Sequence, residues 1–190
     1  GNDTFVAVGQ TSNAYWDNGT QRCSSSYRNE IFTSANEASS WSEQDSPYYQ
    51  CKDHYGVGYG SSNTFMAVGE SGKIDRSTNS GTSWDNMTTG SSPYPNWSSS
   101  TQYLYGVAFG NGTFVAVGSG GKIIRSNDNG VTWYNSTSNT SNHLRAVTFG
   151  NNTFVAVGSS GTIRTSPDGI TWTTRNSETS NTLYGVTFKQ

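Results

Sequence analysis

Residues 104–133 read LYGVAFGNGTFVAVGSGGKIIRSNDNGVTW, and residues 144–172 repeat the pattern as LRAVTFGNNTFVAVGSSGTIRTSPDGITW. An earlier copy, HYGVGYGSSNTFMAVGESGKIDRSTNSGTSW, begins at His54. A degenerate copy is split between GNDTFVAVG at residues 1–9 and EIFTSANEASSW at residues 30–41. Self-similarity at a fixed period is the sequence signature of a repeat architecture.

The period and the strand pattern predict the blades of a β-propeller. Phe114 and Phe154 lie 40 residues apart, close to the ~40–45 residues typical of a four-stranded blade. Each copy reads as three short strands, LYGVAF, TFVAVG and KIIRS, and a fourth that begins at the Trp. TFVAVG is apolar on both alternating faces, which is expected of a strand buried between two neighbouring blades.

The turn before the fourth strand carries the most specific motif. Residues 126–133 match the pattern S-x-D-x-G-x-x-W in full. The other copies depart from it in small ways: Asn79 for Asp in residues 77–84, one residue fewer in residues 166–172, and Asn36 and Ala38 for Asp and Gly in residues 34–41.

On this motif the chain resembles the Asp-box (BNR) repeat proteins, a group that includes sialidases and several lectins. The resemblance implies a β-propeller in which the Asp box is a structural turn. Its carboxylate would hold backbone N–H groups, and its Trp would pack between strands. The residues assigned to this role are Ser77, Asn79, Gly81, Trp84, Ser126, Asp128, Gly130, Trp133, Ser166, Asp168, Gly169 and Trp172.

We therefore predict a single all-β domain over residues 1–190, a four-bladed β-propeller of four-stranded blades. The C-terminal LYGVTFKQ reads as a first strand and the N-terminal GNDTFVAVG as a second. We expect the C-terminal strand to complete the first blade and close the ring, which would remove an exposed edge. The predicted blades are 183–190 with 1–44, 54–88, 103–137 and 143–176, with irregular loops at 10–29, 45–53 and 86–103.

Composition and charge exclude several classes of function. The formal net charge is −2, whereas nucleic-acid binding needs a basic surface. There is no apolar run near the ~20 residues of a membrane span. The two cysteines, Cys23 and Cys51, are predicted to form a disulfide in an oxidising compartment; the alternative is two free thiols. His54 and His143 show no metal-ligand spacing with them, so no metal is expected.

The irregular loops gather aromatic residues on one predicted face of the propeller. Exposed rings beside Asn and Ser are suited to sugar stacking or protein contact; the alternative is that they pack beneath their own loops. These candidate contacts are Tyr15, Trp16, Tyr27, Tyr48, Tyr49, Tyr94 and Trp97. A second set occupies equivalent first-strand positions and would either line the central channel or pack between blades: Tyr55, Tyr105, Arg145 and Tyr184.

Sequons N-x-S/T mark candidate glycosylation sites, which fits a secreted, extracellular protein. They occur at Asn2, Asn18, Asn86, Asn96, Asn111, Asn135, Asn139 and Asn151.

No constellation of catalytic residues emerges from the sequence. Arg76 and Arg125 share one repeat position and Arg164 is offset from it by one, so they are not expected to converge as a sialidase arginine triad would. We predict a protein that is not an enzyme and uses no cofactor. The leading hypothesis is a structural subunit of an extracellular filament or surface assembly, with itself as partner through loop-face stacking or terminal-strand exchange.

Two alternatives remain open. One is a glycan-binding, lectin-like or adhesive module. The loops that join successive blades differ in sequence, which counts against a sugar site repeated in every blade. The other is the remnant of a sialidase-like glycosidase.

Overall fold

The computed structural model describes residues 4–10, 14–17, 20–23, 31–35, 38–44, 52–87 and 102–189, with the backbone alone for 14–17 and 20–23. These residues form short antiparallel strands joined by turns. Among them there is no helix of the length and apolarity that crossing a membrane requires.

The strands form blades in chain order, and the all-β class predicted from the sequence is confirmed. Blade 1 contains β1 (Phe5–Val8), β4 (Ile31–Ser34) and β5 (Ser42–Gln44). Blade 2 contains β6 (His54–Tyr59), β7 (Phe65–Gly69), β8 (Ile74–Ser77) and β9 (Asp85–Asn86). Blade 3 contains β10 (Leu104–Gly110), β11 (Thr113–Gly118), β12 (Ile123–Ser126) and β13 (Tyr134–Ser136). Blade 4 contains β14 (Leu144–Gly150), β15 (Thr153–Gly158), β16 (Ile163–Ser166) and β17 (Thr173–Arg175).

Two kinds of smaller element connect or extend the blades. A 3-10 turn follows the second strand of blades 2, 3 and 4: η1 (Glu70–Gly72), η2 (Ser119–Gly121) and η3 (Ser159–Gly161). Strands β2 (Ala14–Asp17) and β3 (Thr20–Cys23) form a separate two-stranded hairpin. This hairpin lies in the segment predicted as the 10–29 loop of blade 1.

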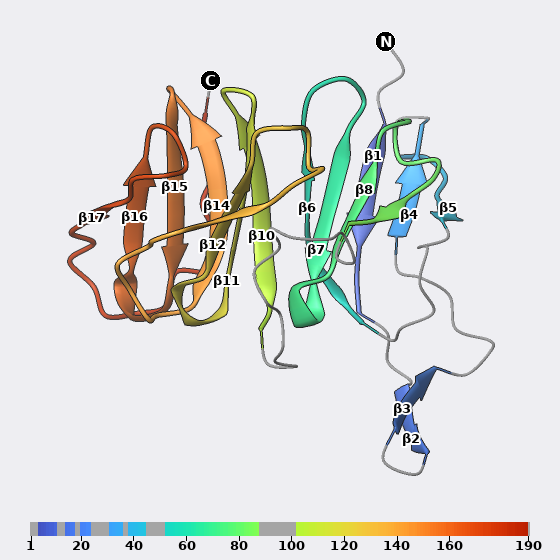
Figure 1. Cartoon of the computed structure of the whole chain (residues 1–190), viewed down its shortest axis with the longest axis horizontal. Helices are drawn as coiled ribbons and strands as arrows, with labels where there is room; N and C mark the ends of the chain where they lie inside the picture. The colour runs from blue at the N-terminus through green and yellow to red at the C-terminus, as the bar shows by residue number, and fades with distance from the viewer. Residues whose placement is uncertain are drawn as a thin grey trace.

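The blades stand side by side in chain order, with blade 1 and blade 4 at opposite ends of the long dimension (Figure 1). The first strands of consecutive blades, β6, β10 and β14, are close neighbours. Glycines permit this approach, because a Cβ on Gly56 would lie 2.8 Å from the Tyr105 carbonyl oxygen. The first strands therefore form the inner rim of the blade array.

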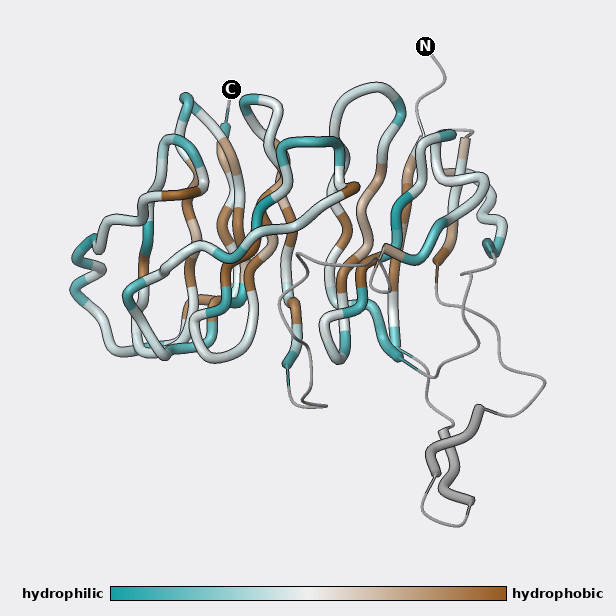
Figure 2. Tube along the Cα trace, viewed as in Figure 1, coloured by the Kyte–Doolittle hydropathy of each residue, from teal (hydrophilic) through white to brown (hydrophobic). Residues whose placement is uncertain are grey.

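The core lies between blades, where the apolar stretches of the strands meet (Figure 2). Alternate residues of β11 serve two interfaces. Phe114 and Ala116 pack with Met66 of blade 2, whereas Val115 and Val117 pack with Phe154 of blade 4. The two-sided burial predicted for TFVAVG is thus present in blade 3.

The predicted ring closure is not shown. β1 is the edge strand of a three-stranded sheet, and residues 183–189 form no strand. They lie instead against blade 4, where the Leu183 N–H donates to the Gly158 carbonyl oxygen at 3.0 Å. The His54 N–H makes the equivalent bond to Gly9 at 3.1 Å. The C-terminal segment thus sits on blade 4 as the first strand of blade 2 sits on blade 1.

Candidate functional site

The Asp-box residues hold the turn between the third and fourth strands of blades 2, 3 and 4. In blade 3 the Ser126 hydroxyl donates to Asp128 at 2.7 Å and accepts from the Gly130 N–H at 2.9 Å. Asp128 also accepts from the Thr132 N–H at 2.8 Å, and the Trp133 indole donates to the Gly130 carbonyl at 3.2 Å. All of these partners lie within the turn itself.

Hydrogen bonds to the box carboxylates favour their ionised forms. At Asp128, burial alone would raise the pKa, but bonds from Thr132 and Ser126 outweigh it and the pKa lies below its ordinary value. At Asp168 the backbone N–H groups of Thr171 and Ile170 lower the pKa. In blade 2 Asn79 supplies the same acceptor, taking the Ser83 N–H at 3.0 Å. A neutral amide therefore fits the same turn.

The box glycines lie at the contact with the preceding blade. Gly130 has φ +83°, and a Cβ there would lie 2.0 Å from the Met66 methyl of blade 2. A Cβ on Gly169 would lie 2.8 Å from a Val115 methyl of blade 3. The turn thus joins neighbouring blades as well as neighbouring strands.

Most of the predicted loop-face contacts lie outside the described residues: Tyr27, Tyr48, Tyr49, Tyr94 and Trp97. Tyr15 and Trp16 lie in the β2 hairpin, where the backbone alone is described. The same holds for Cys23 in β3, and Cys51 lies outside the described residues. These sites and the disulfide stay predictions.

The candidate glycosylation sites divide in the same way. Asn2, Asn18 and Asn96 lie outside the described residues. Asn86 is half-buried in β9, whereas the other sites have exposed side chains: Asn111, Asn135, Asn139 and Asn151.

A cluster of aromatic and cationic side chains lies on the inner rim, and we call it the rim cluster: Tyr55, Tyr103, Tyr105, His143 and Arg145. The Tyr55 ring lies 6.0 Å from Tyr103 and 5.9 Å from Tyr105, centroid to centroid. The Arg145 guanidinium carbon lies 4.6 Å from the Tyr105 centroid, a cation–π contact. The cluster therefore spans blades 2, 3 and 4, and its members contact one another across blade boundaries.

A recurring irregularity places three of these side chains. The ladder between the first and second strands shifts register around Tyr55, Tyr105 and Arg145 in turn. A bulge leaves one residue out of the ladder and redirects its side chain. The equivalent residue of the C-terminal segment, Tyr184, is 76% exposed.

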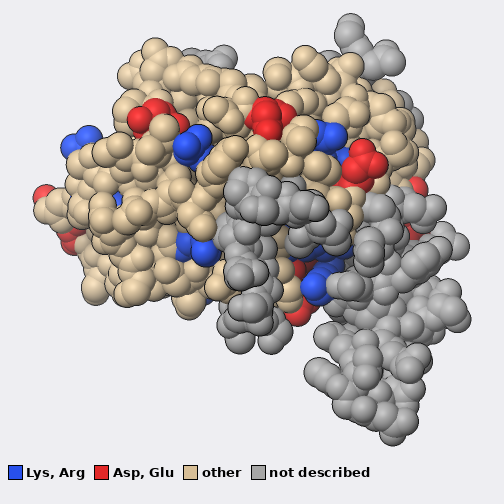
Figure 3. Space-filling view, in the orientation of Figure 1, with Lys and Arg blue, Asp and Glu red and all other residues tan. Residues whose placement is uncertain are grey.

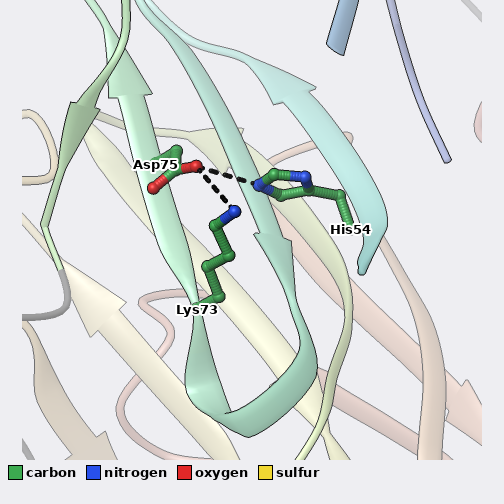
Figure 4. Close-up of polar contacts among 3 residues, drawn as sticks. All are labelled: His54, Lys73 and Asp75. Carbon is green, nitrogen blue, oxygen red and sulfur yellow. Dashed lines mark hydrogen bonds and ion pairs between the residues drawn. The ribbon is translucent and has the colours of Figure 1, made fainter. Parts of the chain in front are cut away.

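A buried charged cluster lies inside blade 2 (Figure 4). Asp75 on β8 accepts from His54 on β6 at 3.0 Å and from Lys73 at 3.4 Å. All three side chains are buried. Burial lowers the pKa of His54 below its ordinary 6.5, more than the hydrogen bond to Asp75 raises it. Burial likewise lowers the pKa of Lys73, against the attraction of Asp75. The cluster is thus screened from solvent in the described structure.

The sequence analysis did not identify this cluster, although the repeat contained a signal. The positions of His54 and Asp75 hold Leu104 and Ile124 in blade 3, both fully buried. A paired change from two apolar residues to an imidazole and a carboxylate indicates a direct contact.

The arginines of the third strands have separate structural partners. Arg164 donates to the Ser138 and Asn139 carbonyls at 2.9 and 3.2 Å. Arg76 donates to the Asn129 carbonyl at 3.4 Å, and Arg125 lies 5.5 Å from the Tyr134 ring centroid. The three arginines therefore have different partners in different parts of the fold.

One broad face of blade 1 exposes apolar side chains, and we call it the leading face: Phe5, Ala7, Phe32 and Trp41. Their equivalents in blade 3 are the fully buried residues that pack on blade 2: Phe114, Ala116, Ile124 and Trp133. On the leading face Phe5 is 47% exposed, Phe32 38% and Trp41 45%. Blade 1 therefore presents the surface that the other blades use to contact a preceding blade.

The opposite end of the array carries the complementary surface, the trailing face, made of Val155, Val157, Ile163 and residues 183–189. In blade 3 the equivalents Val115, Val117 and Ile123 pack on blade 4. Phe188 lies against Gly150, where a Cβ would come within 2.0 Å of its ring. Phe149 lies in the same way against Gly110.

Charged residues are scattered over the surface. Acidic and basic side chains occur in small groups among neutral residues on the described part of the face in Figure 3. This agrees with the low net charge of −2.

Comparisons with known proteins place the fold among the β-propellers. No protein-family model matches the chain, and no curated protein matches it. A solved structure described as YCF48 bound to D1 peptide has TM-score 0.59 and 20% identity, over 82% of this chain and 50% of that one. YCF48 from Cyanidioschyzon merolae has TM-score 0.57 and 22% identity, over 70% and 42%. An ancestral GH74 enzyme has TM-score 0.54 and 19% identity, over 75% and 20%.

At these identities the likeness concerns the fold. The neighbours and the blade sheets together define a protein of the β-propeller class. The chain spans half or less of the length of each of these solved structures.

Proposed function

We propose that this protein is a non-enzymatic, secreted structural subunit that assembles with further copies of itself into an extracellular filament. The observation that carries the proposal is the complementarity of the leading and trailing faces. The blade 3 equivalents of the leading face pack on blade 2, and the blade 3 equivalents of the trailing face pack on blade 4. A second copy would extend the array by repeating an interface that already exists.

The internal repeat supplies the expected pairing. In blade 3 Phe109 lies opposite Phe114 and Val107 opposite Ala116. By the same register, Phe188 of one copy would lie opposite Phe5 of the next, and Val186 opposite Ala7. Residues 183–189 would then become the missing first strand of the neighbour's blade 1, which is strand addition at a sheet edge.

Hydrophobic burial supplies the driving force for this contact. Phe5, Phe32 and Trp41 are each more than a third exposed in the single chain. Burying a large apolar side chain completely contributes roughly 1.5–3 kcal/mol. Because the two faces differ, the contact is heterologous and generates a ring or an open filament, depending on the rotation between copies.

Negative-stain electron microscopy and light scattering of the purified chain over a concentration series test the proposal. We expect filaments, and a mass that grows with concentration. Closed rings of two copies would support strand addition but reject the filament. A 20.5 kDa species at every concentration would reject self-assembly.

A matched pair of variants separates strand addition from other modes of contact. Val186→Asp places a charge at the position that Val107 occupies in the buried core of blade 3. We expect this variant to remain a single chain. Ser180→Asp adds the same charge at an exposed position just before the segment and should assemble as the unmodified chain does.

A further inference from the structure

We propose that the rim cluster is a binding site for an acidic sugar, with Arg145 receiving the carboxylate of a uronic acid residue. The site lies on the inner rim, away from the leading and trailing faces. Its function does not depend on whether the chain assembles.

Arg145 is the first element of the argument. Its guanidinium lies on the Tyr105 ring, and its buried Nε makes no hydrogen bond within the described structure. An arginine fixed by a ring presents a planar fork that suits a carboxylate.

His143 contacts the same tyrosine ring as Arg145, that of Tyr105. Its Nδ1 accepts the Gly120 N–H at 3.0 Å, so the proton of the neutral imidazole lies on Nε2. The ring meets Tyr105 edge-on at 6.3 Å, and the side chain is exposed. The Nε2–H therefore offers a second donor within the rim cluster.

The opposite end of the cluster distinguishes a sugar from a polyanionic peptide. Asp53 precedes Tyr55 by two residues, and the Glu70 N–H donates to the Asp53 carbonyl at 2.9 Å, so both acidic residues lie at the Tyr55 end of the cluster. Burial, and then the charges of Asp53 and Glu70, raise the pKa of Tyr55 to about 12. The Tyr55 hydroxyl thus keeps its proton as a donor. Carboxylates at this end would repel further acidic groups but accept hydroxyl donors. One carboxylate at Arg145 and hydroxyls toward Tyr55 are the pattern of a uronic acid.

The faces of the Tyr105 ring are occupied by its neighbours in the rim cluster. Tyr105 is covered by Arg145 and is stacked with Tyr103 at 6.2 Å and 12°. We therefore assign to Tyr105 a positioning role, in which it holds the guanidinium in place.

Titration calorimetry with sodium glucuronate and with glucose tests the proposal, since the two sugars differ only in the C6 carboxylate. We expect glucuronate to bind and glucose to bind at least tenfold more weakly. Arg145→Gln should weaken glucuronate binding about tenfold or more, because a charge-assisted hydrogen bond is lost. Arg145→Lys should fall between them.

Arg125→Gln is the matched control, because Arg125 also lies over a tyrosine and has a buried Nε without a partner, but it stands outside the cluster. We expect it to bind glucuronate as the unmodified chain does. Equal binding of glucose, or unchanged binding by Arg145→Gln, would overturn the proposal. Tighter binding of an oligoaspartate peptide than of glucuronate would overturn the assignment to a sugar.

Discussion

At the scale of single residues, the turns of the blades show where the backbone conformation selects the side chain. Gly81, Gly130 and Gly169 have φ between +73° and +83° in the Asp-box turns. Ala38 takes the same position in blade 1 with φ +61°. An L-residue with a Cβ is strained there by about 1–2 kcal/mol, so blade 1 contains a turn that its sequence does not favour.

Ala38→Gly should therefore stabilise the protein by about 1 kcal/mol, after the greater freedom of glycine in the unfolded chain is counted. For a chain of this size the expected rise in Tm is about 2–4 °C, measured by thermal unfolding. Gly130→Ala should instead lower Tm, because the new Cβ would meet the Met66 methyl and the backbone φ at this position is positive. A lower Tm for Ala38→Gly would show that the turn is not strained in solution.

Asp128 offers a second test at this scale. Asp128→Ala removes the acceptor for Ser126 and the Thr132 N–H, and we expect a loss of about 1–2 kcal/mol in the free energy of unfolding. Asp128→Asn should cost less than half as much, because Asn79 makes the equivalent contacts in blade 2. Denaturant unfolding measures both. Equal losses would mean that the carboxylate charge decides the stability of the turn.

At the scale of a single blade, the buried cluster of blade 2 predicts a dependence on pH. The pKa of His54 is lowered in the folded chain, so the unfolded chain binds more protons below pH 6.5. The contribution of His54 to stability is therefore complete above pH 6.5 and is lost as the pH falls through the folded pKa.

His54→Leu with Asp75→Ile rebuilds blade 2 on the pattern of Leu104 and Ile124 in blade 3, and Lys73→Thr, on the pattern of Thr162 in blade 4, removes the buried cation that Asp75 pairs with. Replacing a buried ionic group by apolar residues of similar volume is often neutral or stabilising, so Tm at pH 7.5 should be equal or higher. Between pH 7 and 5.5 the variant should lose less stability than the unmodified chain. Parallel pH profiles would exclude His54 as the titrating group.

The repeat allowed much of each blade to be predicted, because strand alternation and the Asp-box spacing are local properties. The two-sided burial of Phe114 and Val115 followed from the pattern alone. The bulges at Tyr55, Tyr105 and Arg145 did not, because a bulge depends on how two strands pair. The rim positions were noted as equivalent, but their contacts across blades, and those of His143, depend on the distance between blades.

At the scale of the whole molecule, the arrangement of the blades was the least predictable feature. The sequence predicted closure by residues 183–190, because LYGVTFKQ matches a first strand. The segment does take a first-strand position, but on the trailing face, with blade 1 at the other end of the array (Figure 1). Sequence similarity identifies the strand's role, whereas the angle between blades determines which edge it can reach.

Mixing two disabled variants would test the heterologous contact. Val186→Asp leaves a working leading face, and Phe32→Asp leaves a working trailing face. Each alone should remain a single chain, whereas the mixture should form pairs with twice the 20.5 kDa mass of one chain and grow no further. Growth beyond pairs, or none at all, by light scattering would contradict contact through these two faces.

The buried cluster of blade 2 also bears on how four similar repeats find their own partners during folding. Blades 3 and 4 have the same second-strand sequence, TFVAVG, and the blades share one repeat pattern, so a strand from one repeat could pair mistakenly within another. His54 in such a place would meet Ile124 rather than Asp75 and leave a buried polar group without its partner, which costs about 1–3 kcal/mol. The His54–Asp75 pair therefore distinguishes blade 2 from the other repeats and favours the pairing of its strands with one another. Correct pairing in blade 2 in turn fixes which strands are left for the blades on either side.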